Sequence, residues 1–261
     1  MRINQFISHN SDFSRRQADE LIKQGLVELK TKEKNSKNSP KIAKLSDTVS
    51  KDDLVFIRGK RLFIKTKFSL IIYHKPKGEL VSHKDERGRR TIYESLPCEF
   101  KTWQSVGRLD YASTGLLILS DSAKIVSSLM KSDLERKYYL KIKGKINEKV
   151  LEAMQNGLEI QGLKGAHPKS KLKTMKIAPF LNYEIFGESG GYTKLRVLIK
   201  EGQNRELRRF FGFFDLRVMD LKRVGFGVID LGNLKEGKFR YFSQTEYDKL
   251  RDFLRYTRSR S

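Results

Sequence analysis

The sequence predicts an α+β protein with two domains, a small N-terminal α/β module at residues 1–62 and a larger domain at residues 67–261. A length of 261 residues exceeds one small domain, which predicts two units of unequal size. Hydrophobic residues make up 38% of the chain, enough for a core despite 33% charged residues. Strand patterns dominate the larger domain, so we expect a mixed, mostly antiparallel sheet flanked by helices there.

The N-terminal segment has the periodicity of two short helices followed by a strand. Apolar residues at positions 3, 6 and 7 lie on one helical face. Ser14–Gln17 has the pattern of a capping box, and Gly25 is a natural end for the second helix. Val27–Leu29 then alternates like a strand, and residues 30–44 are rich in Lys, Ser and Asn. This pattern predicts the small α/β module.

Short apolar runs and turn residues define the elements of the larger domain. Leu70–Tyr73 predicts a strand that ends before Pro76 and turns back as a hairpin at Gly78. Leu116–Leu119 is short and continuously apolar, as expected of a strand buried on both faces. Asp121 follows that strand, where we expect it to cap a helix.

Another helix is predicted to begin near Arg205. Its apolar residues recur at i, i+3, i+4 and i+7, and they are Leu207, Phe210, Phe211 and Phe214. This spacing predicts a stripe that packs into the core rather than a platform for stacking bases. The segments YYLKIKG, TKLRVLIKEG and VGFGVIDLG indicate further strands.

The strong positive charge predicts a polyanionic partner. Lys and Arg number 54 against 31 Asp and Glu, which gives a net charge of +23 and a pI of about 10.0. No apolar run approaches the roughly 20 residues that a bilayer span requires, which favours nucleic acid over membrane. Cys98 is the only cysteine, which suits a reducing cytoplasm. We expect no metal site, because the histidines lack ligand spacing; they are His9, His74, His83 and His167.

Asp110 is the strongest candidate for chemistry. It lies in SVGRLDYASTGLLILSDS, residues 105–122, just before the strand expected to be buried. An Asp ahead of a Ser-Thr-Gly turn is most often a turn or cap residue. However, a side chain at the rim of a sheet is held rigidly, and Arg108 precedes it.

Three segments resemble the ordered motifs of pseudouridine synthases, in the branch that modifies ribosomal RNA. GRLDYASTGLLILSDS resembles the central motif and implies that Asp110 is the catalytic carboxylate. LERKYYLKIKG resembles the segment with the active-site tyrosine, which places that role on Tyr138. EGQNRELRRFF resembles the motif whose arginine, here Arg208, pairs with the carboxylate. KPKG matches the opening motif, although His74 stands where Asn is common.

The N-terminal stretch RINQFISHNSDFSRRQADELIKQGLVEL resembles the RNA-binding module named after small-subunit ribosomal protein S-four. It departs from that module at residues 29–31, where Val-Asn-Gly is frequent, and in a longer Lys-rich loop. Both domains are therefore expected to touch RNA. The residues that we expect to contact RNA are Arg15, Arg16, Lys23, Lys75, Lys77, Arg108, Asn204, Arg205 and Arg209.

The resemblance implies an enzyme that converts uridine to pseudouridine on a flipped-out nucleotide, without a cofactor. Asp110 would either attack ribose C1′ or remove the C2′ proton, and both routes stay open. A carboxylate beneath a base is desolvated, so a guanidinium within about 4–6 Å, here Arg208, is expected to keep it charged. The motif QNRELRRFF resembles the form found in enzymes that act on large-subunit ribosomal RNA more than it resembles the small-subunit form. The expected partner is ribosomal RNA or an assembly intermediate, and we expect a cytoplasmic monomer.

Two other functions are compatible with parts of the sequence. A non-catalytic ribosome-assembly factor could use the same RNA-binding module and would not need Asp110, Tyr138 and Arg208 to converge. A metal-dependent nuclease would need clustered carboxylates. The available acidic pairs, at residues 52–53 and 85–86, lie in turn-like polar segments, which disfavours that function.

Overall fold

The protein was analysed as a computed structural model that describes residues 1–31, 39–161 and 174–258. Much of the Lys-rich stretch, at 32–38, and His167 lie outside the described residues. The chain forms two compact units. The first comprises Met1–Ser69 with the short segments Thr102–Gln104 and Ser120–Ser127, and the second comprises the remainder of the chain.

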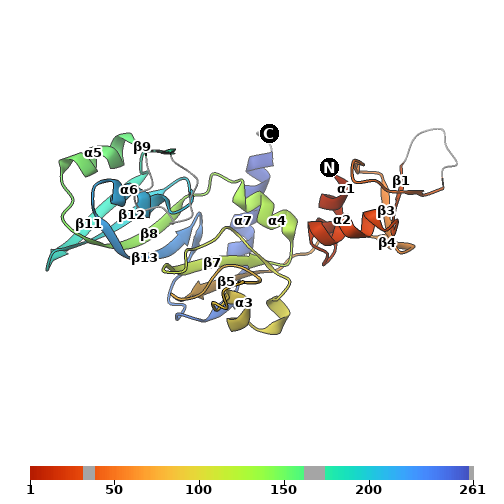
Figure 1. Ribbon diagram of the computed structural model, residues 1–261, viewed down its shortest axis with the longest axis horizontal. Coiled ribbons are helices and arrows are strands. Elements are labelled where there is room, and N and C mark those ends of the chain that lie inside the picture. The colour runs from red at the N-terminus through yellow and green to blue at the C-terminus, as the bar shows by residue number, and fades with distance from the viewer. Residues whose placement is uncertain (32–38, 162–173, 259–261) are drawn as a thin grey trace. The chain divides into compact units, whose positions relative to one another are not determined.

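The first unit packs two helices against a small antiparallel sheet (Figure 1). The helices are α1 (Ile3–Asn10) and α2 (Arg15–Lys23). The sheet has the order β2-β1-β3-β4, with strands β1 (Val27–Lys30), β2 (Lys41–Ile42), β3 (Leu54–Ile57) and β4 (Lys60–Leu62). The predicted capping box is confirmed: the Gln17 amide donates to Ser14 Oγ, and the Ser14 amide donates to Gln17 Oε1. Gly25 follows α2 with a φ of 70°, the left-handed conformation that glycine favours.

The second unit is built on a nine-stranded sheet whose main path runs β11-β12-β8-β13-β7-β5-β15. The pairs β11–β12, β12–β8, β8–β13 and β5–β15 are antiparallel, and β13 and β7 are parallel. This sheet confirms the predicted α+β class. The strands on the path are β5 (Leu70–Lys75), β7 (Thr114–Ser120), β8 (Arg136–Lys143), β11 (Asn182–Ser189), β12 (Tyr192–Ile199), β13 (Arg217–Phe226) and β15 (Phe239–Tyr241).

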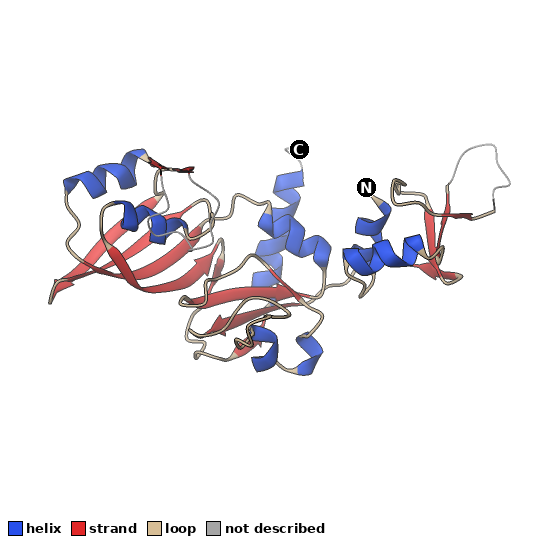
Figure 2. Ribbon diagram, viewed as in Figure 1, coloured by secondary structure: helices blue, strands red, loops and turns tan. Residues whose placement is uncertain are grey.

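Shorter strands and five further α-helices occur in the described part of the chain (Figure 2). The strands are β6 (Gln104–Ser105) beside β7, β14 (Ile229–Asp230) beside β13, and the separate pair β9 (Leu158–Gln161) and β10 (Thr174–Ile177). The α-helices are α3 (Ile92–Ser95), α4 (Ala123–Met130), α5 (Glu148–Asn156), α6 (Glu206–Phe213) and α7 (Gln244–Arg258).

Helix α6 packs into the core of this unit through the stripe that its sequence predicts. Leu207, Phe210 and Phe211 are buried, and Phe214 packs against the same cluster. The aromatic side chains contact one another, and the Phe210 and Phe211 rings lie 5.1 Å apart at 82°. The interpretation of these phenylalanines as core is therefore confirmed. Figure 2 shows α5 and α6 over the same part of the sheet.

Strand β7 is buried along its whole length, as predicted for a continuous apolar run. It lies very close to β13 at Gly115. A Cβ at this position would lie 2.1 Å from the carbonyl oxygen of Arg223, and the φ of Gly115 is 112°. Only glycine is compatible with this approach. The contact fixes β13 against β7 at a point five residues after Asp110.

The hairpin predicted at Gly78 does not form. Strand β5 lies between β7 and β15 in the sheet, so its partners come from distant parts of the chain. The Gly78 amide instead donates to the carbonyl oxygen of Tyr111 at 2.8 Å. The turn thus ties the end of β5 to the loop that carries Asp110.

The prediction that Asp121 caps a helix is also wrong. Its carboxylate accepts the Ser69 amide at 2.8 Å and pairs with Lys65 Nζ at 3.1 Å. The side chain that reaches a free amide of the first turn of α4 is that of Ser122, which accepts from Ile125 at 3.4 Å. The Asp121 carboxylate therefore binds the Lys65 cation and the Ser69 amide instead of an amide of α4.

Candidate active site

Asp110 lies in the loop between β6 and β7. Its carbonyl oxygen accepts the Ser113 amide at 3.0 Å, which closes the turn ahead of the buried strand. The side chain is 26% exposed, so the carboxylate is reachable from solvent yet flanked by protein. The rigid strand and the turn together fix the direction of this carboxylate.

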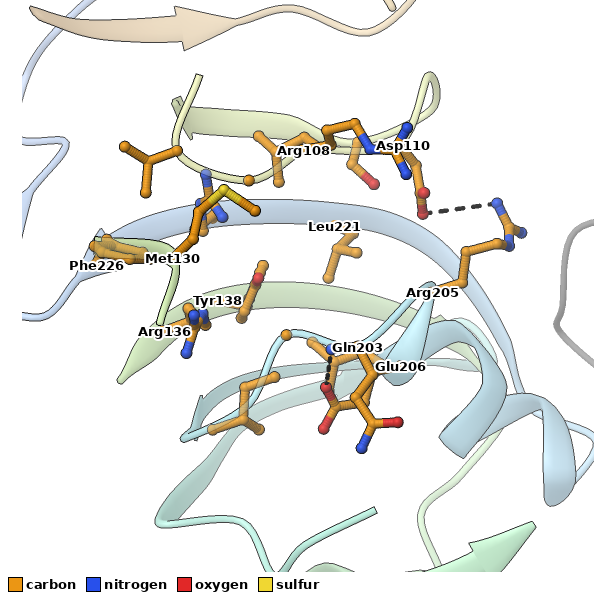
Figure 3. Close-up of a pocket in the computed structure, with 18 residues that line it drawn as sticks. Arg108, Asp110, Met130, Arg136, Tyr138, Gln203, Arg205, Glu206, Leu221 and Phe226 are labelled. Atoms are coloured by element: carbon orange, nitrogen blue, oxygen red, sulfur yellow. Dashed lines mark hydrogen bonds and ion pairs between the residues drawn. The ribbon is translucent and has the colours of Figure 1, made fainter. Parts of the chain in front are cut away.

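Two arginines from the start of α6 lie against Asp110. Arg208 Nε is 3.5 Å and Arg205 Nη1 is 3.6 Å from Asp110 Oδ2. Figure 3 shows the Arg205 contact as a dashed line. Arg205 has a φ of 54° and a ψ of 28°, a left-handed conformation that costs about 1–2 kcal/mol for a residue with a Cβ. The backbone is therefore strained at the residue that meets the carboxylate.

Arg208 is held in place by the protein around it. Its guanidinium donates to the carbonyl oxygens of Val218 at 3.0 Å and Ala112 at 3.3 Å, and to Ser113 Oγ at 3.3 Å. Burial lowers the pKa of Arg208, and the nearby charge of Asp110 opposes that shift. An arginine remains protonated under such conditions, so Arg208 presents a positive charge to Asp110.

A cavity of about 170 Å³ opens beside these residues. Asp110, Arg205, Tyr138, Leu221 and Met130 are among its lining residues (Figure 3). This volume is below the range typical of drug-sized ligands or large cofactors, so it suits one small planar group.

Tyr138 forms part of the wall of this cavity. Its side chain is 7% exposed, and it belongs both to the core cluster and to the cavity lining. It lies on β8 directly opposite Arg223 of β13. Figure 3 shows Tyr138 across the cavity from the loop that carries Asp110. The structure thus brings together all three residues that the resemblance marks as catalytic.

Two further arginines line the cavity and were not singled out from the sequence. Arg136 and Arg223 both have their guanidinium groups near the Phe226 ring, at 5.1 and 5.7 Å from its centroid. Arg223 Nε also donates to the Leu116 carbonyl oxygen at 2.7 Å. Burial lowers the pKa of Arg136. The sequence signal that could have identified Arg136 is the alternation of side chains along β8, which puts Arg136 on the same face as Tyr138.

Glu206 is a buried acid at the cavity that sequence reasoning also missed. Its side chain accepts the Gln203 amide at 2.7 Å, and the residue is 4% exposed (Figure 3). Burial raises its pKa to about 7, although the hydrogen bond and Arg136 act in the opposite direction. The contact caps the start of α6 and so supports the neighbouring Arg205.

Two of the expected RNA contacts are corrected by burial. Lys75 and Arg209 each have 0% exposed surface, so their side chains cannot meet RNA. Lys75 Nζ donates to the carbonyl oxygens of Pro76 at 2.8 Å and Ser113 at 3.0 Å, and burial lowers its pKa to about 8. Lys75 therefore holds the end of the Asp110 loop.

The other expected contacts lie at least partly on the surface. Arg108 and Asn204 are exposed near the cavity, and Lys77 is exposed but paired with Asp220. On α2 the cations are exposed, and they are Arg15, Arg16 and Lys23. Lys23 also pairs with Glu20 at 3.0 Å.

The other chemistries find little support in the described residues. No group of three His, Cys, Asp or Glu side chains that could hold a metal ion occurs in the described part of the chain. The Asp85 carboxylate is bound by Arg89 at 2.7 Å, which explains that acid without a metal. Within the same ranges, no helix is long and apolar enough to cross a membrane.

Comparison with known proteins assigns a family to this fold and site. The family described as RNA pseudouridylate synthase matches residues 69–212. A Helicobacter pylori protein named "Uncharacterized RNA pseudouridine synthase" is 46% identical over 258 residues, covering 97% of this chain and 95% of that protein. The Bacillus subtilis "Ribosomal large subunit pseudouridine synthase B" is 27% identical over 252 residues, covering 96% of this chain and 95% of that protein.

A solved structure shares the same fold. The crystal structure of a pseudouridylate synthase superposes with a TM-score of 0.63 at 24% identity, covering 96% of this chain and 99% of that one. The chain therefore belongs to the RNA pseudouridylate synthase family, whose members act on RNA. It is a pseudouridine synthase, which disfavours the alternative of a non-catalytic ribosome-assembly factor.

Proposed function

We propose that the protein isomerises a specific uridine of ribosomal RNA to pseudouridine, with Asp110 as the catalytic carboxylate. The observation that carries this proposal is the position of Asp110 between Arg205 and Arg208, at a small cavity walled by Tyr138. Isomerisation needs one carboxylate at the sugar, a way to hold the detached base, and exclusion of water.

Asp110 acts on the ribose of the target nucleotide. The bond between C1′ and N1 breaks, the uracil turns, and a new bond joins C1′ to C5, so no redox equivalent is consumed. Asp110 either attacks C1′ or takes the C2′ proton, and both routes require the ionised acid. Arg205 and Arg208 favour that charged form because opposite charges within about 4–6 Å do so.

Tyr138 holds the detached uracil. Its ring forms one wall of the cavity and can stack on the base, and its phenolic oxygen accepts the proton that C5 loses, while N1, freed from C1′, takes up one proton so that the reaction is an isomerisation. Leu221 and Leu207 also line the cavity, and their apolar side chains help to exclude water while the base turns.

The target uridine leaves its stack to reach the cavity. Flipping a base costs a few kcal/mol, and phosphate contacts offset that cost. Arg108 and Asn204 supply such contacts near the cavity, and Lys77 is a further exposed cation of this unit. The first unit adds the exposed face of α2, as its resemblance to the S-four-like module implies. We propose residues 1–62 as that RNA-binding domain and residues 67–261 as the catalytic domain.

Ribosomal RNA of the large subunit is the proposed substrate class. The Bacillus subtilis relative is named for the large ribosomal subunit, and the form of the QNRELRRFF motif agrees with that group. The net charge of +23 favours a large folded RNA or an assembly intermediate. We propose that the protein acts on it as a monomer, in the cytoplasm and without a cofactor.

Mapping of pseudouridines in ribosomal RNA tests this function. RNA from cells with and without the gene is compared, and the deleted strain is complemented with the wild-type gene or with Asp110→Asn. We expect one or a few large-subunit pseudouridines to disappear on deletion and to return only with the wild-type gene. Identical maps with and without the gene would remove ribosomal RNA as the substrate.

A further inference from the structure

The strands β11, β12, β8 and β13 have a second face, opposite the cavity. Side chains alternate along a strand, so Tyr138, Leu140 and Ile142 of β8 point into the core while the residues between them point the other way. Figures 1 and 2 show α5 and α6 on one side of these strands. We call the opposite side the open face, and its members are partly or fully exposed.

The open face is rich in cations. The pairing register places Lys194 of β12 opposite Lys141 of β8, and Tyr139 opposite both Arg196 and Lys222. Like charges directly opposite one another in a sheet are destabilising. On its other side Lys141 faces Asp220 of β13, whose carboxylate pairs with Lys77, so a bound polyanion would still reduce the repulsion between Lys194 and Lys141.

Few carboxylates balance these cations. Glu184 pairs with Arg196 at 2.6 Å, Asp230 pairs with Lys137 at 3.3 Å, and Asp220 pairs with Lys77. Among the described residues, no ion pair to a carboxylate is found for four lysines of this face. They are Lys141, Lys143, Lys194 and Lys222.

Aromatic rings lie between these lysines. Tyr139 is 42% exposed and Phe186 is 53% exposed, and their rings meet edge to face at 5.9 Å. Lys141 Nζ lies 4.4 Å from the centroid of the Tyr192 ring. A positive surface with exposed aromatic rings is the combination with which proteins bind single-stranded nucleic acid, because phosphates meet the cations and bases stack on the rings.

We propose that the open face is a second RNA-binding surface, which binds an unpaired segment of the RNA. The segment is separate from the one that carries the target uridine, since the side chains of this face and those of the cavity point in opposite directions. Neighbouring strands lie about 4.8 Å apart and residues rise about 3.3 Å along a strand, so Lys194 and Lys222, two strands and two residues apart in the register, lie about 12 Å from each other, within reach of one RNA strand. The proposal goes beyond the proposed function and rests on it only for RNA as the partner.

Salt-dependent binding of a labelled single-stranded oligouridylate tests the surface. The full chain is compared with a triple variant, Lys143→Gln, Lys194→Gln and Lys222→Gln. Each lost phosphate contact lowers the slope of log K against log salt by about 0.7, so we expect the slope to fall by about 2 and affinity at physiological salt to drop about tenfold. The kcat for modification should stay at the wild-type value while KM rises.

The matched control removes the same charge elsewhere in the second unit, with Lys149→Gln, Lys235→Gln and Lys249→Gln, three lysines exposed away from this face. We expect it to keep nearly the wild-type slope. A further variant, Phe186→Ala, should weaken binding of the single strand about fivefold or more at every salt concentration and leave binding of an RNA duplex unchanged.

Equal slopes for the triple variant and its control would overturn the proposal. The proposal would also be overturned if the triple variant lost self-association and kept RNA binding, because the open face would then be a protein interface. Equal losses for duplex and single strand in Phe186→Ala would rule out the unpaired segment. None of these results depends on Asp110. If isomerisation does not require Asp110, the proposed function is contradicted, and the salt-dependence slopes are unaffected.

Discussion

Replacement of Arg208 by methionine tests the ionic environment of Asp110. Methionine keeps much of the length of the side chain and removes the charge. In the structure, Arg208 Nε lies 3.5 Å from Asp110 Oδ2. Coulomb's law gives about 5 kcal/mol for two unit charges at that distance with an effective dielectric constant of about 20.

The net effect is smaller for two reasons. The Asp110 side chain is 26% exposed, so water screens the pair, and Arg205 remains at 3.6 Å in the variant. We therefore expect a loss of roughly 1–3 kcal/mol of transition-state stabilisation, about 5- to 150-fold in kcat/KM.

Single-turnover assays with ribosomal RNA measure this loss. Arg208 also donates to Val218 and Ala112, so the thermal midpoint of each variant is measured to separate unfolding from loss of chemistry. Arg251→Met is the control, because it removes an exposed arginine that pairs with Asp248 on α7. A wild-type rate in Arg208→Met would refute the proposed role of the ion pair.

Three other predictions follow from the geometry. Tyr138→Phe keeps the stacking ring and loses the hydroxyl group, so kcat should fall about 100-fold with little change in KM; a wild-type kcat would exclude proton transfer by Tyr138. For Glu206, burial raises the folded-state pKa from 4.5 to about 7, so the folded state holds a proton that the unfolded state has lost, and stability falls as pH rises through that window. Urea unfolding should show Glu206→Gln more stable than wild type at pH 8, by up to roughly 2–3 kcal/mol, and no such gain at pH 4. The exposed control Glu152→Gln should show no gain at either pH. A difference between Glu206→Gln and wild type that does not change with pH would contradict the raised pKa of Glu206. Gly115→Ala places a Cβ 2.1 Å from the Arg223 carbonyl oxygen and should lower the free energy of unfolding by more than about 3 kcal/mol. The control Gly232→Ala has open space around the new Cβ and should lower it by only about 1 kcal/mol. Equal losses of stability in the two variants would show that β7 and β13 are not closely packed at Gly115.

Local patterns predicted the elements whose determinants are local. The capping box at Ser14–Gln17, the apolar stripe of α6 and the buried strand β7 all depend on residues close in sequence, and each is confirmed. The hairpin at Gly78 failed because β5 pairs with strands from distant segments. Turn residues identify where a chain bends and carry no information on which strand it meets afterwards.

The candidate site was only partly predictable for the same reason. Asp110, Tyr138 and Arg208 were found through a resemblance, because a lone Asp before a turn carries little signal. Arg223 lies opposite Tyr138 only through the register of β13 and β8, which the sequence does not specify. Lys75 and Arg209 were expected on the surface because charged side chains are rarely buried, and both are buried.

The most direct test of the catalytic proposal is pseudouridine formation by purified Asp110→Asn on ribosomal RNA, with RNA binding measured on the same preparation. Asparagine preserves the shape of the side chain and removes its charge, so the folded protein and its affinity for RNA should be retained. We expect no detectable pseudouridine in the time that the wild-type enzyme needs for complete conversion. Conversion by the variant at a rate near that of the wild type would contradict the role of Asp110.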